Sequence, residues 1–270
     1  TFDWTHDTVT PTVTITVPGI AGGGAYFDGT TYWFGPTSYN GGTSPGYLLA
    51  NFQFSEPVTS LDSGDFDLTG NVSGGTLTTV GVTGISSTHY EVLFDFSASI
   101  GGNCTINIKA AACQDLAGNN NAVPSPFPLN YDKNQPAANV AVATPTNAYS
   151  FTVDLSGASE NGSGLGAMTF STDNGTTWTQ SDGSTAGWET FSSNPTYTLP
   201  SNLQSDGSHT IKVKVRDNVE NESPVDSATV VVDTQAPTMT ITSSTVTSGS
   251  TTSDASIALT FTASEATGTF

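Results

Sequence analysis

One linker sequence recurs along this chain, and the recurrence limits how the chain can fold. The stretch HDTVTPTVTI at residues 6–15 returns as VDTQAPTMTI at residues 232–241, and a shorter form, DKNQPA, stands at residues 132–137. Each copy follows a run in which apolar and polar residues alternate, the pattern of a strand with one buried face. Because such self-similarity indicates tandem structural units, we expect three repeats, each begun by a linker that contains Asp and Pro.

Strand patterns also fill the stretches between the linkers. Apolar residues alternate with polar ones at residues 13–17, 211–215 and 257–261, and clusters with Gly, Asn-Gly or Asp-Gly interrupt the chain at short intervals. Runs with the periodicity of a helix are nearly absent. The sequence therefore predicts an all-β fold, and 270 residues are enough for two complete domains and a remainder.

Two acidic elements recur at matched places within the repeats. The first residue of the loop Asp115–Asn119 lies 17 residues before the next linker Asp, Asp132. The first residue of the loop Asp217–Asn221 lies 16 residues before Asp233. A Glu closes the second expected strand at Glu56 in the first repeat and at Glu265 in the third, and Glu160 is the candidate in the middle repeat. Repetition at such similar spacing indicates that these elements occupy equivalent positions in each unit.

These landmarks predict the domain boundaries. Linker Asp and Glu are 49 residues apart in the first repeat and 32 in the third, so the first repeat contains an insertion of 17 residues. The predicted units are the last strand of a preceding repeat at 1–6, repeat 1 at 7–131 with an aromatic, Gly-rich hairpin insertion at about 18–47, repeat 2 at 132–232, and the first two strands of a truncated repeat 3 at 233–270.

The motifs that mark each repeat have a known counterpart. An Asp-x-x-x-Pro start, FSEPV at residues 54–58 and DLAGN at residues 115–119 resemble the tandem bacterial-type immunoglobulin-like repeats of large cell-surface adhesins, with similar repeats in algal and protist surface proteins. The resemblance implies immunoglobulin-like β-sandwiches in a linear array. It also implies calcium at the junctions and an adhesive or spacer role at the cell surface.

The sandwich geometry itself predicts cation sites. In such a domain the linker, the end of the second strand and the loop before the last strand meet at one pole. Carboxylates gathered there repel one another unless a cation neutralises them, and calcium accepts many oxygen ligands; the alternative is that these residues only form turns. The candidate ligands are Asp7, Glu56, Asp115 and Asn119 in repeat 1, Asp132, Glu160, Asp217 and Asn221 in repeat 2, and Asp233 and Glu265 in repeat 3.

Charge and composition exclude several functions. The chain carries 24 acidic and 5 basic residues, a net charge of −19, which disfavours nucleic acid and anionic membrane surfaces as partners. No apolar run is long enough to cross a membrane, and we expect an extracellular fragment of a mature protein. His6, His89 and His209 lack local partners for catalysis, so no enzyme is predicted. Cys104 and Cys113 are either bridged or two buried thiols.

The insertion is the feature that a plain spacer does not need. Its aromatic residues suit a carbohydrate or protein partner, and the alternative is that part of them covers the open edge of their own sandwich. The candidates are Tyr26, Phe27, Tyr32, Trp33, Phe34 and Tyr39.

Together these observations predict a structural or adhesive segment of a long extracellular rod, with neighbouring repeats or other copies of the protein as partners. Two further interpretations stay open. The first is a carbohydrate- or surface-binding module that acts through the aromatic hairpin. The second is a subunit of an extracellular filament or flagellar hair, in which a neighbour covers the apolar face of Ile257, Leu259 and Phe261.

Overall fold

The computed structural model describes residues 5–18, 25–36, 46–59, 61–70, 78–96, 101–184 and 187–265. Apart from strands, the described residues form two 3-10 turns, η1 (Ser63–Asp65) and η2 (Ser201–Leu203). No helix in these ranges is long and apolar enough to cross a membrane. The predicted all-β fold is confirmed.

The first sandwich consists of two facing sheets. The first sheet has the order β1 (Val13–Thr16), β4 (Tyr47–Phe54), β7 (His89–Asp95), β6 (Thr78–Ser86). The second has the order β2 (Ala25–Phe27), β3 (Tyr32–Phe34), β9 (Phe127–Asp132), β8 (Gly101–Ile108), β5 (Phe66–Gly70). Between them Phe66 packs against Phe52 at 4.8 Å and Phe94 at 6.4 Å, both edge to face. Alternating apolar residues from both sheets thus make one core.

The hairpin insertion extends the second sheet. Its strands β2 and β3 pair around an Asp28-Gly29 turn, as the Asp-Gly signal predicts. β3 then pairs with the last strand β9 in parallel, with Tyr32 opposite Leu129. The insertion therefore lies along an edge of its own sandwich and hydrogen-bonds to it.

The second sandwich has a separate core. One sheet has the order β10 (Ala141–Val142), β11 (Ser150–Asp154), β14 (Thr196–Thr198), and the other has the order β13 (Glu189–Thr190), β12 (Leu165–Ser171), β15 (Gly207–Asp217), β16 (Asp226–Val232). Ile211, Val213 and Val215 of β15 are fully buried, as their alternation predicts, and Phe170 lies 5.1 Å from Tyr197 between the ring centroids. The first core draws on residues 13–131 and the second on residues 138–232, while the boundaries between repeats stay a prediction.

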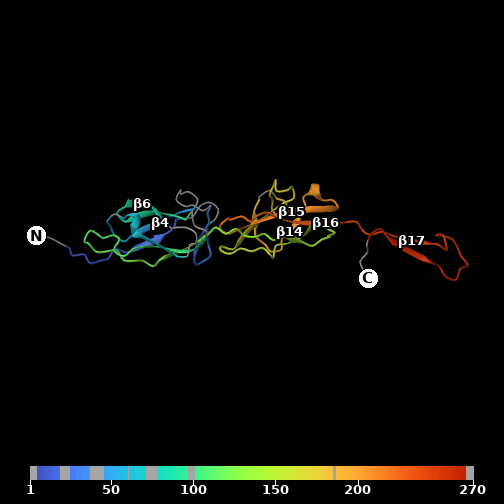
Figure 1. The fold of residues 1–270 in the computed structure, drawn as a ribbon, viewed down its shortest axis with the longest axis horizontal. Coiled ribbons are helices and arrows are strands. Elements are labelled where there is room, and N and C mark those ends of the chain that lie inside the picture. The colour runs from blue at the N-terminus through green and yellow to red at the C-terminus, as the bar shows by residue number, and fades with distance from the viewer. Residues whose placement is uncertain are drawn as a thin grey trace.

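The third predicted repeat contributes a two-stranded sheet. β17 (Met239–Ser243) and β18 (Leu259–Ala263) pair antiparallel, and Leu259 and Phe261 are 53% and 60% exposed. Figure 1 shows the two sandwiches and this hairpin following one another along the long axis of the molecule. At the other end, the predicted strand at residues 1–6 falls mainly on residues 1–4, outside the described residues, and residues 5–12 form no strand.

Both cysteines are buried free thiols, so the second of the two interpretations of Cys104 and Cys113 applies. Burial raises the pKa of the Cys104 thiol to about 12. Burial, together with the charge of Asp65, raises the pKa of the Cys113 thiol to about 11. Neither thiol is in the reactive thiolate form near neutral pH.

Candidate functional site

The linker Asp has the same local structure in all three repeats. Its side chain accepts a hydrogen bond from the backbone N–H two residues further on, at 2.9 Å for Asp7, 3.0 Å for Asp132 and 3.1 Å for Asp233. This is the hydrogen bond of an Asx turn, and it lies before the linker Pro. The carboxylate is thereby held close to the start of the new repeat.

The Glu that ends the second strand is placed by the Ser before it. In each repeat this Ser exchanges hydrogen bonds with the residue after the linker Pro, in the pairs Ser55 and Thr12, Ser159 and Ala137, and Ser264 and Thr238. In the first and third repeats the Ser backbone N–H donates to the linker carbonyl at 2.9 Å, and its hydroxyl accepts from the linker N–H. The clamp brings Glu56, Glu160 and Glu265 beside the linker.

The loop before the last strand is nearly identical in the two complete repeats. Asp115 Oδ1 accepts from the backbone N–H groups of Ala117 (2.8 Å) and Asn119 (2.9 Å). In the second copy Asp217 Oδ1 accepts from Val219 (2.9 Å) and Asn221 (2.8 Å). Gly118 and its counterpart Glu220 both have positive φ, 91° and 65°, the conformation that the turn requires.

The Asn of each loop ties the loop to the linker. The Asn119 side-chain N–H group donates to Asp115 Oδ2 at 2.8 Å and to the Asp7 carbonyl at 3.2 Å. Asn221 makes the same pair of bonds, to Asp217 Oδ2 at 2.7 Å and to the Asp132 carbonyl at 3.1 Å. These hydrogen bonds join the loop to the linker without a cation.

These elements bring three carboxylates together at each of two junctions. Oxygen atoms of Asp7, Glu56 and Asp115 lie within 4.8 Å of one another, and so do those of Asp132, Glu160 and Asp217. We call these sets the first and second carboxylate clusters. In the third repeat Asp233 and Glu265 line one hollow. The convergence expected from the sandwich geometry is present, although geometry alone does not test metal binding.

The second cluster is the more buried one. Asp132 and Asp217 are 1% and 2% exposed, whereas Asp7 is exposed. Ser163 N–H donates to Asp132 Oδ2 at 2.8 Å, and the neighbouring Gly162 approaches that carboxylate so closely that a Cβ there would overlap it. The second junction thus encloses its carboxylates within the contact between two sandwiches.

The electrostatics show that the clusters lack a counter-charge. Burial and the charges of Asp132 and Asp217 raise the pKa of Glu160, and burial raises the pKa of Asp217. Burial and the charge of Asp7 raise the pKa of Glu56, whereas for Asp115 the hydrogen bonds from its own loop outweigh burial and lower the pKa. Among the described residues no Lys or Arg forms an ion pair with either cluster.

The aromatic residues of the insertion divide between core and surface. Phe34 is fully buried, and Tyr32 stacks on Phe127 at 5.7 Å between ring centroids. Tyr26 and Phe27 are 37% and 51% exposed. Trp33 is half-buried, with its Nε1–H donating to Asp28 Oδ2 at 2.8 Å, and Tyr39 lies outside the described residues. The interpretation that part of the insertion covers its own sandwich therefore applies to Phe34 and Tyr32, while a binding role of the exposed residues stays a prediction.

The sequence analysis did not predict two features of the structure. On β15 the Lys214 ammonium lies 5.1 Å from the Trp178 ring, and the Arg216 guanidinium lies 4.8 Å from the Trp188 ring; the alternation of basic residues along this strand was the available signal. The second is a contact between sandwiches, in which Gly35 of the insertion packs against Val219 of the second loop. Nothing in the local sequence indicates it.

Comparison with known proteins gives a family for part of the chain. Residues 46–127 match the family model of the bacterial Ig-like domain. No curated protein matches the sequence.

Solved structures with similar folds include three multi-domain proteins. The fibronectin(III)-like modules of Clostridium thermocellum CbhA are 14% identical over 81% of this chain and 94% of theirs, with a TM-score of 0.33. A tetra-tandem repeat in the extending region of a large adhesion protein is 18% identical over 88% of this chain and 53% of its own, with a TM-score of 0.28. Domains 1–6 of surface layer protein SbsC are 13% identical over 94% of this chain and 32% of their own, with a TM-score of 0.26.

All three TM-scores are low, so these likenesses are weak, whereas the family match covers most of the first sandwich. As the FSEPV and DLAGN motifs predicted, residues 46–127 of this chain are similar to the bacterial Ig-like domain family.

Proposed function

We propose that this chain is a structural segment of an extracellular surface protein, a rod of Ig-like repeats in which Ca²⁺ at the junctions fixes the orientation of consecutive repeats. Its partners are then neighbouring repeats or further copies of the protein. The observation that carries the proposal is the recurrence of a three-carboxylate cluster at both junctions, with atoms within 4.8 Å in each.

The donor set suits calcium better than other common ions. Each cluster offers three carboxylates, and calcium accepts six to eight oxygen ligands with tolerant geometry. No His or Cys joins either cluster, which disfavours zinc. Asp132, Glu160 and Asp217 would hold the ion at the second junction, and Asp7, Glu56 and Asp115 at the first.

The second junction also contains an unsatisfied ligand atom. Glu160 Oε1 is buried and has no hydrogen-bond partner, while Oε2 accepts from the Gly164 backbone N–H. A buried carboxylate oxygen without a donor is costly in free energy. A cation bound beside it would satisfy this atom and neutralise the repulsion that raises the pKa of Glu160.

A bound ion would stiffen the rod because the three carboxylates come from three segments. Asp132 belongs to the linker, Glu160 to the end of the second strand and Asp217 to the loop before the last strand. One ion shared among them opposes bending at the linker, and its binding free energy stabilises the folded junction.

The experiment compares melting and solution scattering of the 270-residue chain in millimolar calcium, in millimolar magnesium and in chelator. We expect calcium to raise the melting temperature and to lengthen the mean particle, with a smaller effect of magnesium. Glu160→Gln keeps the side-chain shape and should lose the part of the calcium effect that belongs to the second junction. Glu91→Gln on β7, away from both clusters, is the matched control. Identical melting and scattering in calcium and chelator would refute the calcium sites.

A further inference from the structure

The outer face of the second sheet of the first sandwich carries a row of four side chains across four strands. The strand register places Tyr26 opposite Trp33, Trp33 opposite Asn130, and Asn130 opposite Asn103. Residues paired across neighbouring strands project from the same face. At about 4.8 Å between strands, the row is about 14 Å long. We call it the amide–aromatic row.

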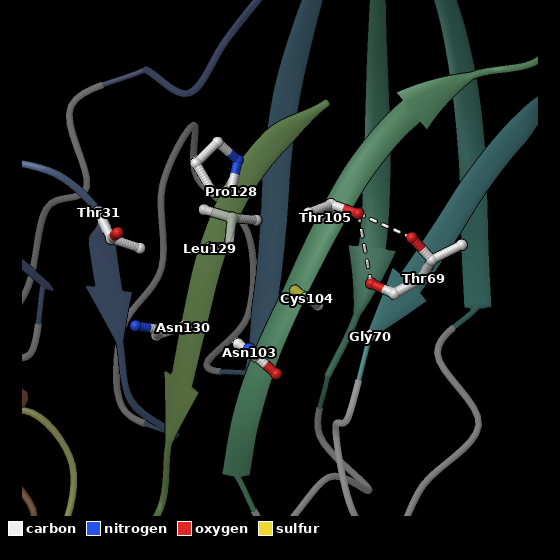
Figure 2. A pocket seen from close by; sticks show the side chains of 9 residues that line it. All are labelled: Thr31, Thr69, Gly70, Asn103, Cys104, Thr105, Pro128, Leu129 and Asn130. Atoms are coloured by element: carbon white, nitrogen blue, oxygen red, sulfur yellow. Dashed lines mark hydrogen bonds between the residues drawn. The ribbon is translucent and has the colours of Figure 1, made fainter. Parts of the chain in front are cut away.

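A second row runs beside the first. Thr69 pairs with Thr105 and Thr105 with Pro128, and Thr31 lies at the start of β3 next to Pro128. The Thr69 and Thr105 hydroxyl groups are 2.7 Å apart and hydrogen-bonded (Figure 2). The face between the two rows is therefore polar, with hydroxyl groups along one side and amide groups along the other.

The two rows border two adjoining hollows. A hollow of about 440 Å³ is lined by Thr31, Thr69 and Thr105 together with Asn103 and Asn130. A second hollow of about 340 Å³ contains Trp33 and shares Asn103 and Asn130 with the first. It continues to Asn134 and Asn161 at the start of the second sandwich. Because the hollows share two residues, they adjoin, and we call the two together the groove.

The groove presents unused hydrogen-bonding groups. Within the described part of the chain, the side-chain amides of Asn103 and Asn130 make no hydrogen bond, and Figure 2 shows Asn130 extending toward β3. Each amide offers two donors and an acceptor. The first hollow is lined by no side chain of Asp, Glu, Lys, Arg or His, and the charged residue that lines the second hollow, Asp132, is only 1% exposed. The ligand of the groove should therefore be uncharged and rich in hydroxyl groups.

The indole ring is held in place before any ligand arrives. Asp28 Oδ2 accepts from Trp33 Nε1–H at 2.8 Å, while Asp28 Oδ1 accepts from the backbone N–H groups of Thr30 and Thr31, both at 2.8 Å. The bonds from the Trp33 side chain and this turn hold the pKa of Asp28 well below its usual range. A fixed aromatic face loses little conformational entropy on binding.

We propose that this groove binds a neutral oligosaccharide, with the Trp33 ring against a sugar face and Asn103 and Asn130 bonded to sugar hydroxyls. Aromatic stacking combined with neutral polar donors recognises a molecule that has apolar ring faces and many hydroxyl groups. An anionic glycan is disfavoured by the net charge of −19. The activity is additional to the role of a rod, and the first hollow contains no residue of either carboxylate cluster.

The test is calorimetric titration of the 270-residue chain with neutral gluco-, xylo-, manno- and galacto-hexasaccharides, with an oligogalacturonate and a protein-derived peptide mixture as competing classes. We expect at least one neutral hexasaccharide to bind, equally in calcium and in chelator. Asn103→Ala/Asn130→Ala should weaken it tenfold or more without changing the melting temperature, because neither amide supports the fold. Trp33→Ala should abolish binding.

Asn202→Ala, an exposed asparagine in the second sandwich, is the matched control and should bind as the unaltered chain does. The proposal is overturned if no neutral hexasaccharide binds at millimolar concentration. It is equally overturned if binding survives the double Asn substitution, or if the acidic oligosaccharide or the peptides bind instead.

Discussion

The contact between Gly35 and Val219 predicts how firmly the two sandwiches are joined. Val219 is fully buried yet belongs to neither hydrophobic core, and its counterpart Ala117 in the first loop is exposed. A Cβ added at Gly35 would lie 2.6 Å from the Val219 carbonyl oxygen and 3.1 Å from Val219 Cβ. Gly35→Ala should therefore push the second loop away from the insertion.

The size of the effect follows from that overlap. Ordinary contact begins at 3.4 Å, so the loop must move by about 0.8 Å, and because the nearest atom belongs to the backbone, no rotamer change relieves it. Overpacking of this kind costs about 1–3 kcal/mol. If the cost falls on the junction, local opening becomes roughly 5- to 150-fold more frequent.

Hydrogen exchange followed by mass spectrometry measures this directly. We expect Gly35→Ala to accelerate exchange in the loop Asp217–Asn221, while β12 and β15 in the core of the second sandwich keep their protection. Gly81→Ala is the control, because a Cβ there meets no atom within 4 Å. Unchanged exchange in the loop of Gly35→Ala would show that this contact does not hold the junction, and the reasoning would fail.

Two further predictions concern the second carboxylate cluster and the β17–β18 sheet. In chelator, the pKa values of Glu160 and Asp217 are raised, so the folded state binds protons more tightly than the unfolded chain does. The stability that comes from this proton binding is fully present below the usual pKa of about 4. It is lost as the pH rises through the pKa values of the folded state. The melting temperature should therefore fall as the pH rises above about 4, by more in the unaltered chain than in Glu160→Gln, and equal slopes would contradict this. In the dilute 270-residue chain, amides of β17 and β18 should exchange faster than those of β15, because a two-stranded sheet with an exposed apolar face is only marginally stable; slow exchange at Phe261 in a monomer would argue otherwise.

The carboxylate clusters could be expected from the sequence because their parts repeat. Asp115 and Asp217 lie at nearly equal distances from the next linker, and a sandwich brings the linker, the second strand end and this loop to one pole. Local turn chemistry, in which an Asp side chain bonds to the backbone two residues on, is also a property of short segments. The repeated spacing and the turn-forming residues can therefore both be recognised in the sequence alone.

The groove could not be expected in the same way. The alternation around Trp33 and Asn130 indicates which residues share a face of their own strand, but it does not indicate which strands are neighbours. The parallel pairing of β3 with β9 joins segments about 100 residues apart and sets the amide–aromatic row. Phe34 and Trp33 point to opposite faces because they are neighbours in one strand, and the pairing with β9 places the face of Phe34 on the core.

The sequence by itself determined the strand character of the chain, the linkers between repeats and the acidic residues of the junctions, because these depend on local periodicity, turn-forming residues and repetition. The tertiary structure alone decided that the insertion joins the second sheet, that Gly35 meets Val219, and that the β17–β18 face remains exposed. Such long-range contacts arise from the pairing and packing of whole elements, whose free energies depend on the fold around them and leave no pattern in any one segment.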